Sequence, residues 1–532
     1  MITSPTRYND SGKNTLLDLI LTNCPIHVSK AECLDNFCSD HCPVYCQLSF
    51  QSPQKRSFNR LIWDYGKTNT DALQQEIRST DWDTLLTNNT VDESCSKFTS
   101  ELITVAKKYI PNKLVTIRPR NMPWMNNSIR KLSKLKNKIH KKAKKSDLAD
   151  HWALFHKTRN QYISLIRKCK SEYHESLDNK INDVNNLGSK SWWQVVNSFI
   201  KTTGSSNHDI PPIKTNTGTA FTPIEKANAL NTYFAEQSKL NDLNHPLPLI
   251  NRNTNSITNI TLQPNEVKDM LDSIDTSKSS GPDHISGKLL KSISKEISNP
   301  LCTLFNHSLR CAIFPLIWKH ANVVAIYKKG NKDICSNYRP ISLLSIISKI
   351  LERCIYKHVF NFLLDNNTLT QFQSGFMKGD STIYQLLDLN DFYCNAIDKG
   401  YYTRTVFCNI SKAFDRVWHA GLCLKLDAVG VRGTLYSWFK SYITGRSQCV
   451  VLDNVASESS FVTSGVPQGS VLGPLLFLIY INDIIENIQS NIKLFADDTS
   501  LYLLIKDPSE SAKIMNSDIE KINVWSKNGW FP

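Results

Sequence analysis

Residues 492–503 read Ile-Lys-Leu-Phe-Ala-Asp-Asp-Thr-Ser-Leu-Tyr-Leu, and this stretch decides the fold predicted for the second half of the chain. Two adjacent acids, Asp497 and Asp498, interrupt an otherwise apolar run of strand-forming residues. The pattern predicts a tight hairpin between two short buried strands, with both carboxylates at its tip. Adjacent carboxylates repel each other, so such a pair favours a bound cation such as Mg²⁺. Asp-Asp-Thr-Ser is also ordinary surface-turn chemistry, which is the alternative.

The composition is that of a basic globular protein. The chain has 532 residues, of which 41% are hydrophobic and 10% aromatic, and this excludes a largely disordered protein. The net charge of +15 favours an acidic partner, either nucleic acid or an anionic membrane. The longest apolar run, residues 471–481, is too short to cross a bilayer. Scattered cysteines and a polar segment at residues 1–14, which does not resemble a targeting signal, lead us to expect an intracellular location.

The first fifty residues contain a candidate Asp–His pair. Residues 14–23, Asn-Thr-Leu-Leu-Asp-Leu-Ile-Leu-Thr-Asn, predict a buried strand that carries one acid, Asp18. Asp40 and His41 follow in a loop that leads into another strand. An Asp paired with a His commonly orients an imidazole for work on a phosphate. An incidental acid on a strand and an unrelated loop histidine are the alternative.

Residues 51–204 predict a mostly helical, basic connector. Apolar residues recur at helical spacing through residues 70–110, and residues 124–145 are the most basic part of the chain. The run at residues 130–145 predicts a helix whose cations contact phosphates, because acids are nearly absent before Asp147; a solvated charged face is the alternative. The residues expected to bind nucleic acid are Arg130, Lys131, Lys134, Lys138, Lys141, Lys142, Lys144 and Lys145.

A second helical pattern follows this basic run. Its apolar stripe favours packing in a core over a base-stacking platform. The stripe consists of Trp152, Phe155, Tyr162 and Ile166. Residues 205–262 are rich in Asn, Ser, Thr and Pro and predict a linker region around a short helix near residues 224–234.

Two cationic motifs follow residue 262. Residues 323–330 predict a strand that ends in Lys328 and Lys329. Residues 337–342, Asn-Tyr-Arg-Pro-Ile-Ser, place Arg339 just before a helix that we expect to open at the proline. Cations beside a turn suit a triphosphate, which an arginine can grip with two hydrogen bonds.

Two glycine- or aromatic-bearing motifs lie further along. Residues 406–419, Val-Phe-Cys-Asn-Ile-Ser-Lys-Ala-Phe-Asp-Arg-Val-Trp-His, run from a predicted strand into a helix. Residues 465–474, Gly-Val-Pro-Gln-Gly-Ser-Val-Leu-Gly-Pro, predict a turn that opens a long apolar helix. Such glycines let the backbone approach a ligand, and a helix N-terminus favours anions. Residues 374–382 introduce one more helix.

In this order and spacing, Tyr-Arg-Pro-Ile-Ser, Ser-Lys-Ala-Phe-Asp, Gly-Val-Pro-Gln-Gly-Ser and Phe-Ala-Asp-Asp resemble the reverse transcriptase of non-LTR retrotransposons of the jockey-like LINE group. The resemblance spans residues 262–532, with weaker similarity to the connector of these elements over residues 56–239. It implies an α/β (α+β) fold in which a right-hand polymerase fingers–palm domain follows a mostly helical connector and an endonuclease remnant. The palm should be an antiparallel sheet backed by helices, with Asn409 and Asp497 on adjoining strands.

The resemblance also implies RNA-directed DNA polymerisation. Asp497 and Asp498 would hold two catalytic Mg²⁺ ions, and RNA template, DNA primer and dNTPs would be the partners. Phe414 would be the steric gate against a ribose 2′-hydroxyl. The nucleotide-binding residues would further include Lys328, Lys329, Arg339, Gln468 and Gly469. By the same resemblance we expect a cytoplasmic and nuclear protein that binds no membrane and joins its element RNA in a ribonucleoprotein.

One motif residue departs from the family pattern. The first palm strand of the family has an Asp where this chain has Asn409, and Asp415 belongs to a different position of that motif. Each lost unit-charge interaction at about 4 Å and an effective dielectric near 20 is worth about 4 kcal/mol. The change therefore predicts a polymerase slower by several powers of ten, with weakened Mg²⁺ binding. The alternatives are a non-catalytic nucleic-acid-binding protein and a decayed element fragment.

The N-terminal Asp–His pair resembles the last two motifs of an apurinic/apyrimidinic-type endonuclease. That resemblance implies that Asp18 orients His41 and that Asp40 and His41 face the scissile phosphate. The earlier metal-binding motifs of that family have no room here, so we expect no cleavage. The predicted domains are an endonuclease remnant (1–50), a connector (51–204), a linker region (205–262), and fingers and palm without a thumb (263–532).

Overall fold

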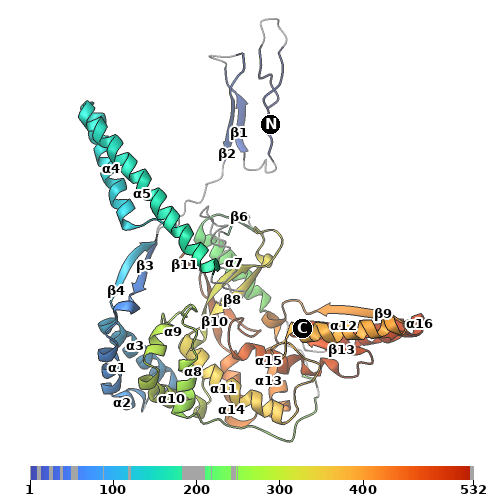
Figure 1. Ribbon diagram of the computed structural model, residues 1–532. Helices are drawn as coiled ribbons and strands as arrows, with labels where there is room; N and C mark the ends of the chain where they lie inside the picture. The colour runs from blue at the N-terminus through green and yellow to red at the C-terminus, as the bar shows by residue number, and fades with distance from the viewer. Residues whose placement is uncertain are drawn as a thin grey trace. The chain divides into compact units, whose positions relative to one another are not determined.

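The computed structural model describes residues 2–8, 14–22, 28–35, 40–48, 58–87, 89–117, 122–182, 210–216, 218–240, 247–248 and 250–527 (Figure 1). The chain forms two compact units. The smaller comprises Met1–Ser57 and Arg118–Ser176, and the larger comprises Phe58–Ile117 and Leu177–Pro532. These units do not divide where the predicted domain limits lie, and those limits stay a prediction.

The smaller unit contains a helical hairpin of α4 (Asn127–Ser146) and α5 (Ala149–Asn182), both labelled in Figure 1, except that α5 belongs to the larger unit from Leu177 onward. Asn126 caps α4 through its side chain, and Asp147 ends it in a left-handed conformation. The helix predicted over the basic run is therefore confirmed. The apolar stripe of α5 is half-buried against α4 rather than enclosed in a core. The Phe155 ring lies 4.7 Å from the His140 ring on α4, and the Lys136 ammonium lies 4.7 Å from the Tyr162 ring centre.

The buried strand predicted over residues 14–23 is wrong for the part that the structure describes. Thr15 makes only an isolated bridge with Arg7, and Leu17, Leu19 and Leu21 are 52%, 58% and 87% exposed. The regular strands described in this unit are β1 (Val28–Cys33) and β2 (Val44–Leu48), which form a two-stranded antiparallel sheet. A two-stranded sheet is too small to bury a further strand on both faces.

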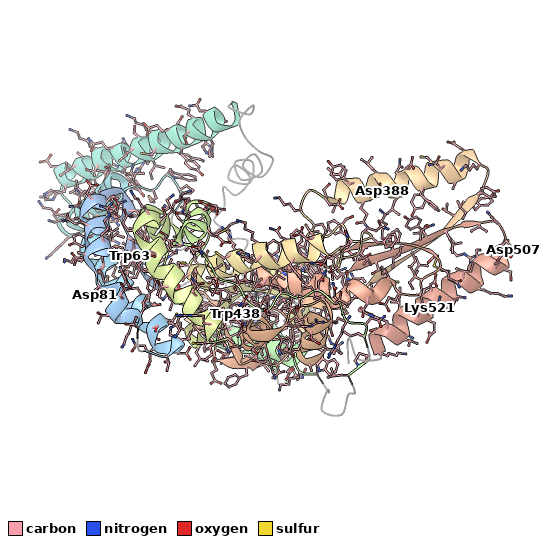
Figure 2. The ribbon with its side chains drawn as sticks, turned by 90° about the horizontal axis from the view of Figure 1, so that it is seen from below. Trp63, Asp81, Asp388, Trp438, Asp507 and Lys521 are labelled. Carbon is pink, nitrogen blue, oxygen red and sulfur yellow. The ribbon has the colours of Figure 1, made fainter. Side chains whose placement is uncertain are left out.

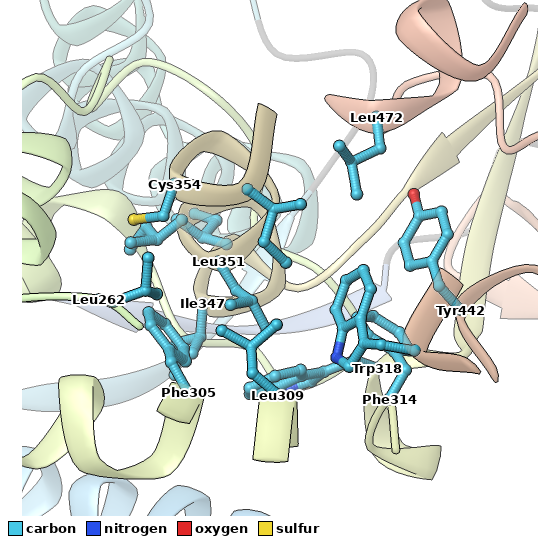
Figure 3. Close-up of a cluster of buried hydrophobic side chains, with 14 of the residues drawn as sticks. Leu262, Phe305, Leu309, Phe314, Trp318, Ile347, Leu351, Cys354, Tyr442 and Leu472 are labelled. Carbon is cyan, nitrogen blue, oxygen red and sulfur yellow. The ribbon is translucent and has the colours of Figure 1, made fainter. Parts of the chain in front are cut away.

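The larger unit is built around helices that bury apolar side chains in one core. The helical structure predicted for residues 70–110 is confirmed, and this segment forms three helices. It contributes Leu73 and Phe98 to the core that holds Phe305. Figure 3 shows aromatic side chains of this core, among them Phe314, whose ring meets those of Trp318 and Tyr442 edge-on. The core helices are α1 (Thr70–Ser79), α2 (Trp82–Leu86), α3 (Val91–Tyr109), α8 (Pro264–Asp272), α9 (Gly287–Ser292), α10 (Ser294–Arg310), α11 (Ile346–Asp365), α13 (His419–Ala428), α14 (Gly433–Ile443) and α15 (Leu472–Ile481).

Helix α15 is the most deeply enclosed of these helices. Nine of its ten residues are buried, because its sequence is apolar on every side. It follows the glycine-rich turn, as predicted from residues 465–474. Two strands, β3 (Phe58–Trp63) and β4 (Asn112–Ile117), pair antiparallel at the two ends of the α1–α3 segment. No helix in the described part of the chain is both long and apolar enough to cross a membrane.

A five-stranded sheet lies beside the core. Its main order is β11-β10-β7-β8, with β12 also paired to β10. The strands are β7 (His320–Tyr327), β8 (Tyr338–Leu343), β10 (Arg446–Leu452), β11 (Val455–Ala456) and β12 (Ser460–Val462). The predicted short helix is confirmed as α7 (Pro223–Gln237), which packs Leu230 and Phe234 with Val323 and Val450 of this sheet. A small hairpin of β5 (Ile213–Thr215) and β6 (Gly218–Ala220) precedes it.

The predicted placement of Arg339 is wrong. Arg339 lies within β8, opposite Ile326 of β7, and the next helix begins only at Ile346. Pro340 therefore does not open a helix. It is accommodated because β8 is an edge strand, where one side of the backbone needs no ladder partner.

A three-stranded antiparallel sheet carries the acidic hairpin. Its order is β13-β14-β9, with β13 (Asn491–Phe495), β14 (Asp498–Ile505) and β9 (Tyr402–Asn409). Helices α12 (Thr382–Asp398) and α16 (Pro508–Trp525) cover its two faces, and Figure 2 shows them on either side of the strands, marked by Asp388 and Lys521. Tyr502 of β14 meets Phe392 of α12, whereas Leu501 packs with Met515 of α16. The predicted antiparallel sheet backed by helices is confirmed.

Candidate active site

The two acids occupy the turn and the first strand residue of a hairpin. Phe495 pairs with Asp498, which leaves Ala496 and Asp497 as a two-residue turn. Ala496 has φ +53°, the left-handed backbone that tight hairpin turns use. Asp498 pairs directly with Asn409 of β9, so Asp498, rather than Asp497, adjoins that strand. The Ile410 N–H donates to the Asp497 carbonyl at 3.3 Å, which holds the end of β9 against the turn.

Burial and the adjacent carboxylate oppose the ionisation of Asp498. Burial and the neighbouring Asp497 charge raise the pKa of Asp498, while the positive charge of Lys328 lowers it. Lys328 stands just beyond the end of β7, so its positive charge favours the ionised form of an acid on the hairpin. A bound cation would relieve the same repulsion between the two carboxylates.

The donor atoms at the turn suit a hard divalent ion. Asp497 and Asp498 offer carboxylate oxygens, and Asn409 offers a neutral amide oxygen, all of the type that Mg²⁺ accepts. In the described part of the chain no group of three or more His, Cys, Asp or Glu side chains could hold a metal. At the acidic turn, the residue that pairs with Asp498 is an asparagine rather than an acid. The oxygen donors of these residues are therefore of the type that a divalent ion accepts.

Phe414 lies in a fixed aromatic contact. It belongs to a single helical turn, Ala413–Arg416, and its ring stacks on Phe477 of α15 with 4.6 Å between ring centres. The Phe376 ring meets it edge-on at 5.9 Å. Phe376 directly follows Gly375, which touches the backbone of Ala496. The predicted gate residue is thus connected through packed groups to the acidic turn.

The glycine-rich loop joins this turn to the five-stranded sheet. Gln468 donates from Nε2 to Asp415 Oδ1 at 2.7 Å, and its carbonyl accepts from the Ser342 N–H at 2.7 Å. Gly469 has φ +117°, and a Cβ there would lie 2.6 Å from the Ser342 carbonyl oxygen. Burial raises the pKa of Asp415 to about 6, although the Gln468 hydrogen bond and Lys412 act in the opposite direction. Asp415 is thereby engaged by the loop.

The sequence reasoning missed a buried acid that supports this loop. Glu352 of α11 is completely buried and accepts hydrogen bonds from the backbone N–H groups of Val471 at 2.7 Å and Leu472 at 3.2 Å. Ser348 Oγ lies 3.0 Å from the same carboxylate. Glu352 therefore caps the start of α15 through Val471 and Leu472, and Val471 lies two residues after Gly469. The signal in the sequence was one acid in the interior of a mostly apolar helix.

The predicted triphosphate cations gather at one end of the β7–β8 hairpin. Lys328 and Lys329 are exposed just beyond β7, and Arg339 is exposed on the facing strand. The Lys328 N–H donates to the Asn337 carbonyl at 2.8 Å, which closes this end of the hairpin. Within the described residues none of the three forms an ion pair, so their charges are available to an anion.

The N-terminal acids and histidine lie in the smaller unit. Asp18 Oδ2 is 2.9 Å from His41 Nδ1, the contact that the endonuclease resemblance implies. This hydrogen bond lowers the pKa of Asp18. Asp40 instead pairs with Arg7, whose Nε lies 2.7 Å from its carboxylate. The Asp40 carboxylate is thus already paired with a cation of its own unit.

Helix α4 presents a cationic face. The exposed lysines on this face recur at spacings of three, four and seven, which places them on one side of a helix. They are Lys131, Lys134, Lys138, Lys141, Lys142 and Lys145. Lys144 is exposed outside this face, Arg130 is half-buried, and Lys136 lies over the Tyr162 ring. None of the six forms an ion pair with another described residue.

An acidic hairpin, a cation-bearing strand pair and a glycine-rich loop are together typical of a nucleic-acid polymerase of the reverse transcriptase class. Residues 326–529 match the family described as reverse transcriptase (RNA-dependent DNA polymerase). Polymerases of this family generally use divalent metal ions and bind a nucleic-acid template and primer.

Similarity to individual proteins narrows the relationship to particular mobile elements. The chain is 26% identical to the RNA-directed DNA polymerase from the mobile element jockey of Drosophila melanogaster, over 98% of this chain and 58% of that protein. It is 30% identical to the probable RNA-directed DNA polymerase from transposon BS of the same organism, over 57% of this chain and 34% of the relative. The corresponding X-element protein is 31% identical over 50% and 30% of the two chains. The chain thus spans only 30–58% of these relatives.

These findings confirm the predicted relationship to non-LTR, jockey-like reverse transcriptases. The roles of the individual site residues, including the endonuclease remnant of Asp18, Asp40 and His41, stay predictions.

Proposed function

We propose that this chain carries the fingers and palm of an RNA-directed DNA polymerase of a non-LTR retrotransposon, and that Asn409 impairs its catalysis. The proposed impairment by Asn409 is supported by the direct pairing of Asn409 with Asp498 across the two strands. Asp497 and Asp498 would hold two Mg²⁺ ions, with the Asn409 amide as a weaker third donor. When bound, these ions would activate a primer 3′-hydroxyl and stabilise the leaving pyrophosphate.

The other residues bind and orient the nucleotide. Lys328, Lys329 and Arg339 bind the triphosphate, because their exposed cations share one end of the β7–β8 hairpin. The charge of Lys328 also lowers the pKa of Asp498. Phe414, held by Phe477, blocks a ribose 2′-hydroxyl. The Gln468–Gly469 loop borders the incoming dNTP and the template. The RNA template and the DNA primer are held through their backbones and their shape. The protein works inside the cell, in the nucleus and the cytoplasm.

Primer extension by the purified full chain on an RNA template tests this function. We expect weak Mg²⁺-dependent extension that disappears in Asp497→Ala. Rapid extension that survives this substitution would contradict the proposed site. Salt-sensitive nucleic-acid binding without any extension would favour the alternative of a non-catalytic binding protein.

We further propose that the cationic face of α4 binds RNA and DNA without sequence preference. Replacing Lys131, Lys134 and Lys138 by Gln should flatten the salt dependence of binding, since each phosphate contact contributes about 0.9 to the slope of log K against log salt. The measurement is the affinity for a labelled RNA at several salt concentrations. The matched control replaces the same three residues by Arg, which keeps the charge. An equal slope in the Gln and Arg variants would refute the proposal.

The N-terminal residues are proposed to be an inactive remnant. Incubation of the chain with supercoiled plasmid and Mg²⁺ should produce no nicking, because Asp40 is paired with Arg7 and the described residues nearby supply no three-acid metal cluster. Gel separation of nicked and supercoiled forms measures the outcome. Nicking that is lost in His41→Ala would show that the Asp18–His41 pair works in a cleavage site after all.

A further inference from the structure

Residues just before α12 run alongside the acidic hairpin. The Leu494 N–H donates to the Phe372 carbonyl at 2.8 Å, and the Ser374 N–H donates to the Leu494 carbonyl at 2.9 Å. The intervening residue, Gln373, is only 6% exposed. Its Oε1 accepts from the N–H of Gly375 at 2.8 Å and from the N–H of Ala496 at 3.0 Å. One buried amide oxygen therefore contacts the turn that places Asp497.

The turn needs such support because Ala496 adopts an unfavourable backbone. A left-handed φ brings a Cβ close to the following carbonyl, and such residues persist where their surroundings fix them. Gly375 allows a close approach here, since a Cβ at this position would lie 2.2 Å from the Ala496 nitrogen. Segment 372–375 thus fixes the turn through both its backbone and the Gln373 side chain.

Burial of the Gln373 amide nitrogen does not stabilise the fold. Within the described structure its Nε2 is buried and makes no hydrogen bond, which is unfavourable for an amide. An apolar side chain of similar length would avoid this loss but could not accept the Ala496 N–H. The amide is therefore explained by its contact with the turn better than by core stability.

We propose that Gln373 is a positioning residue that holds the Ala496–Asp497 turn, and with it the two carboxylates, in the geometry that binds a divalent ion. The metal-binding part of this inference rests on the proposed polymerase function. The part that concerns the turn does not, and the two parts can be tested separately.

Hydrogen exchange of the full chain, followed by mass spectrometry, tests the turn. Gln373→Met should raise exchange in peptides that contain Ala496 and Gly375 about tenfold, the effect of one lost hydrogen bond. Peptides from α15 should be unchanged. The matched control is Gln371→Met, the same substitution at an exposed glutamine two residues earlier. Unchanged exchange at Ala496, or an equal rise in α15, would overturn the inference.

Titration with Mn²⁺, followed by electron paramagnetic resonance, tests the metal-binding part. Asp497→Ala should abolish one Mn²⁺ site. Gln373→Met should lower the Mn²⁺ affinity of that same site several-fold, whereas Gln371→Met should leave the affinity unchanged. If the turn loosens but this affinity stays the same, the positioning role is refuted. If no Asp497-dependent site exists even in the unsubstituted chain, the proposed function fails, and the exchange result alone decides whether Gln373 holds the turn.

Discussion

Asn409→Asp is expected to raise Mg²⁺-dependent primer extension on an RNA template by several powers of ten. Asn409 lies directly opposite Asp498 on antiparallel strands, where the Cβ atoms of paired residues are about 5 Å apart. A carboxylate there adds a third charged donor to the acidic turn. At about 4 Å and a dielectric near 20 each unit-charge interaction is worth about 4 kcal/mol, and every 1.4 kcal/mol in the transition state is tenfold in rate. Extension rates of the two purified chains measure the effect.

Two controls separate metal binding from a general change in charge. Adding Asp497→Ala should abolish the gain, because both acids serve the same ions and act non-additively. Asn491→Asp makes the same chemical change at an exposed position at the other end of the hairpin and should have no effect. Because the relatives are longer than this chain, the comparison is repeated with a thumb segment of a related element fused after Pro532. Equal extension with Asn409 and with Asp at this position in the fused protein would refute the charge argument.

The acidic hairpin was predictable because its signals are local. Two acids between apolar strand-forming residues leave few arrangements other than a turn with carboxylates at its tip. The same holds for α7 and α4, whose periodicity and charge lie within single helices. The pairing of Asn409 with the acids followed from the resemblance alone, since 88 residues separate it from Asp497. Only the structure shows that its partner across the strands is Asp498.

The errors arose where tertiary pairing overrides local preference. Pro340 predicted the start of a helix, but an edge strand of the five-stranded sheet accommodates it, so Arg339 lies on a strand. The leucines of residues 14–22 predicted burial, yet the described part of their unit offers too little sheet to cover them. The roles of Gln373 and Glu352 could not be predicted from the sequence for a related reason. Their importance lies in which backbone N–H groups they meet, and these belong to segments more than 100 residues away.

Glu352→Ala is expected to lower the free energy of unfolding of the larger unit by about 3 kcal/mol, because it leaves two N–H groups at the start of α15 without their acceptor. The loss should concentrate at the loop before α15, where Gln468 engages Asp415. Urea denaturation measures the stability, and hydrogen exchange in α15 peptides locates the change. Glu352→Gln keeps an acceptor oxygen and should lose less.

The matched control is Glu236→Ala, which removes the same side chain from an exposed position on α7. Exposed substitutions of this kind change stability by no more than about 0.5 kcal/mol. If Glu352→Ala proves equally mild and α15 exchanges no faster, then the Glu352 carboxylate does not support the loop. If Glu352→Ala is destabilising while Glu352→Gln is nearly neutral, it is the acceptor oxygen, rather than the charge, that fixes the start of α15 and the Gln468–Gly469 loop before it.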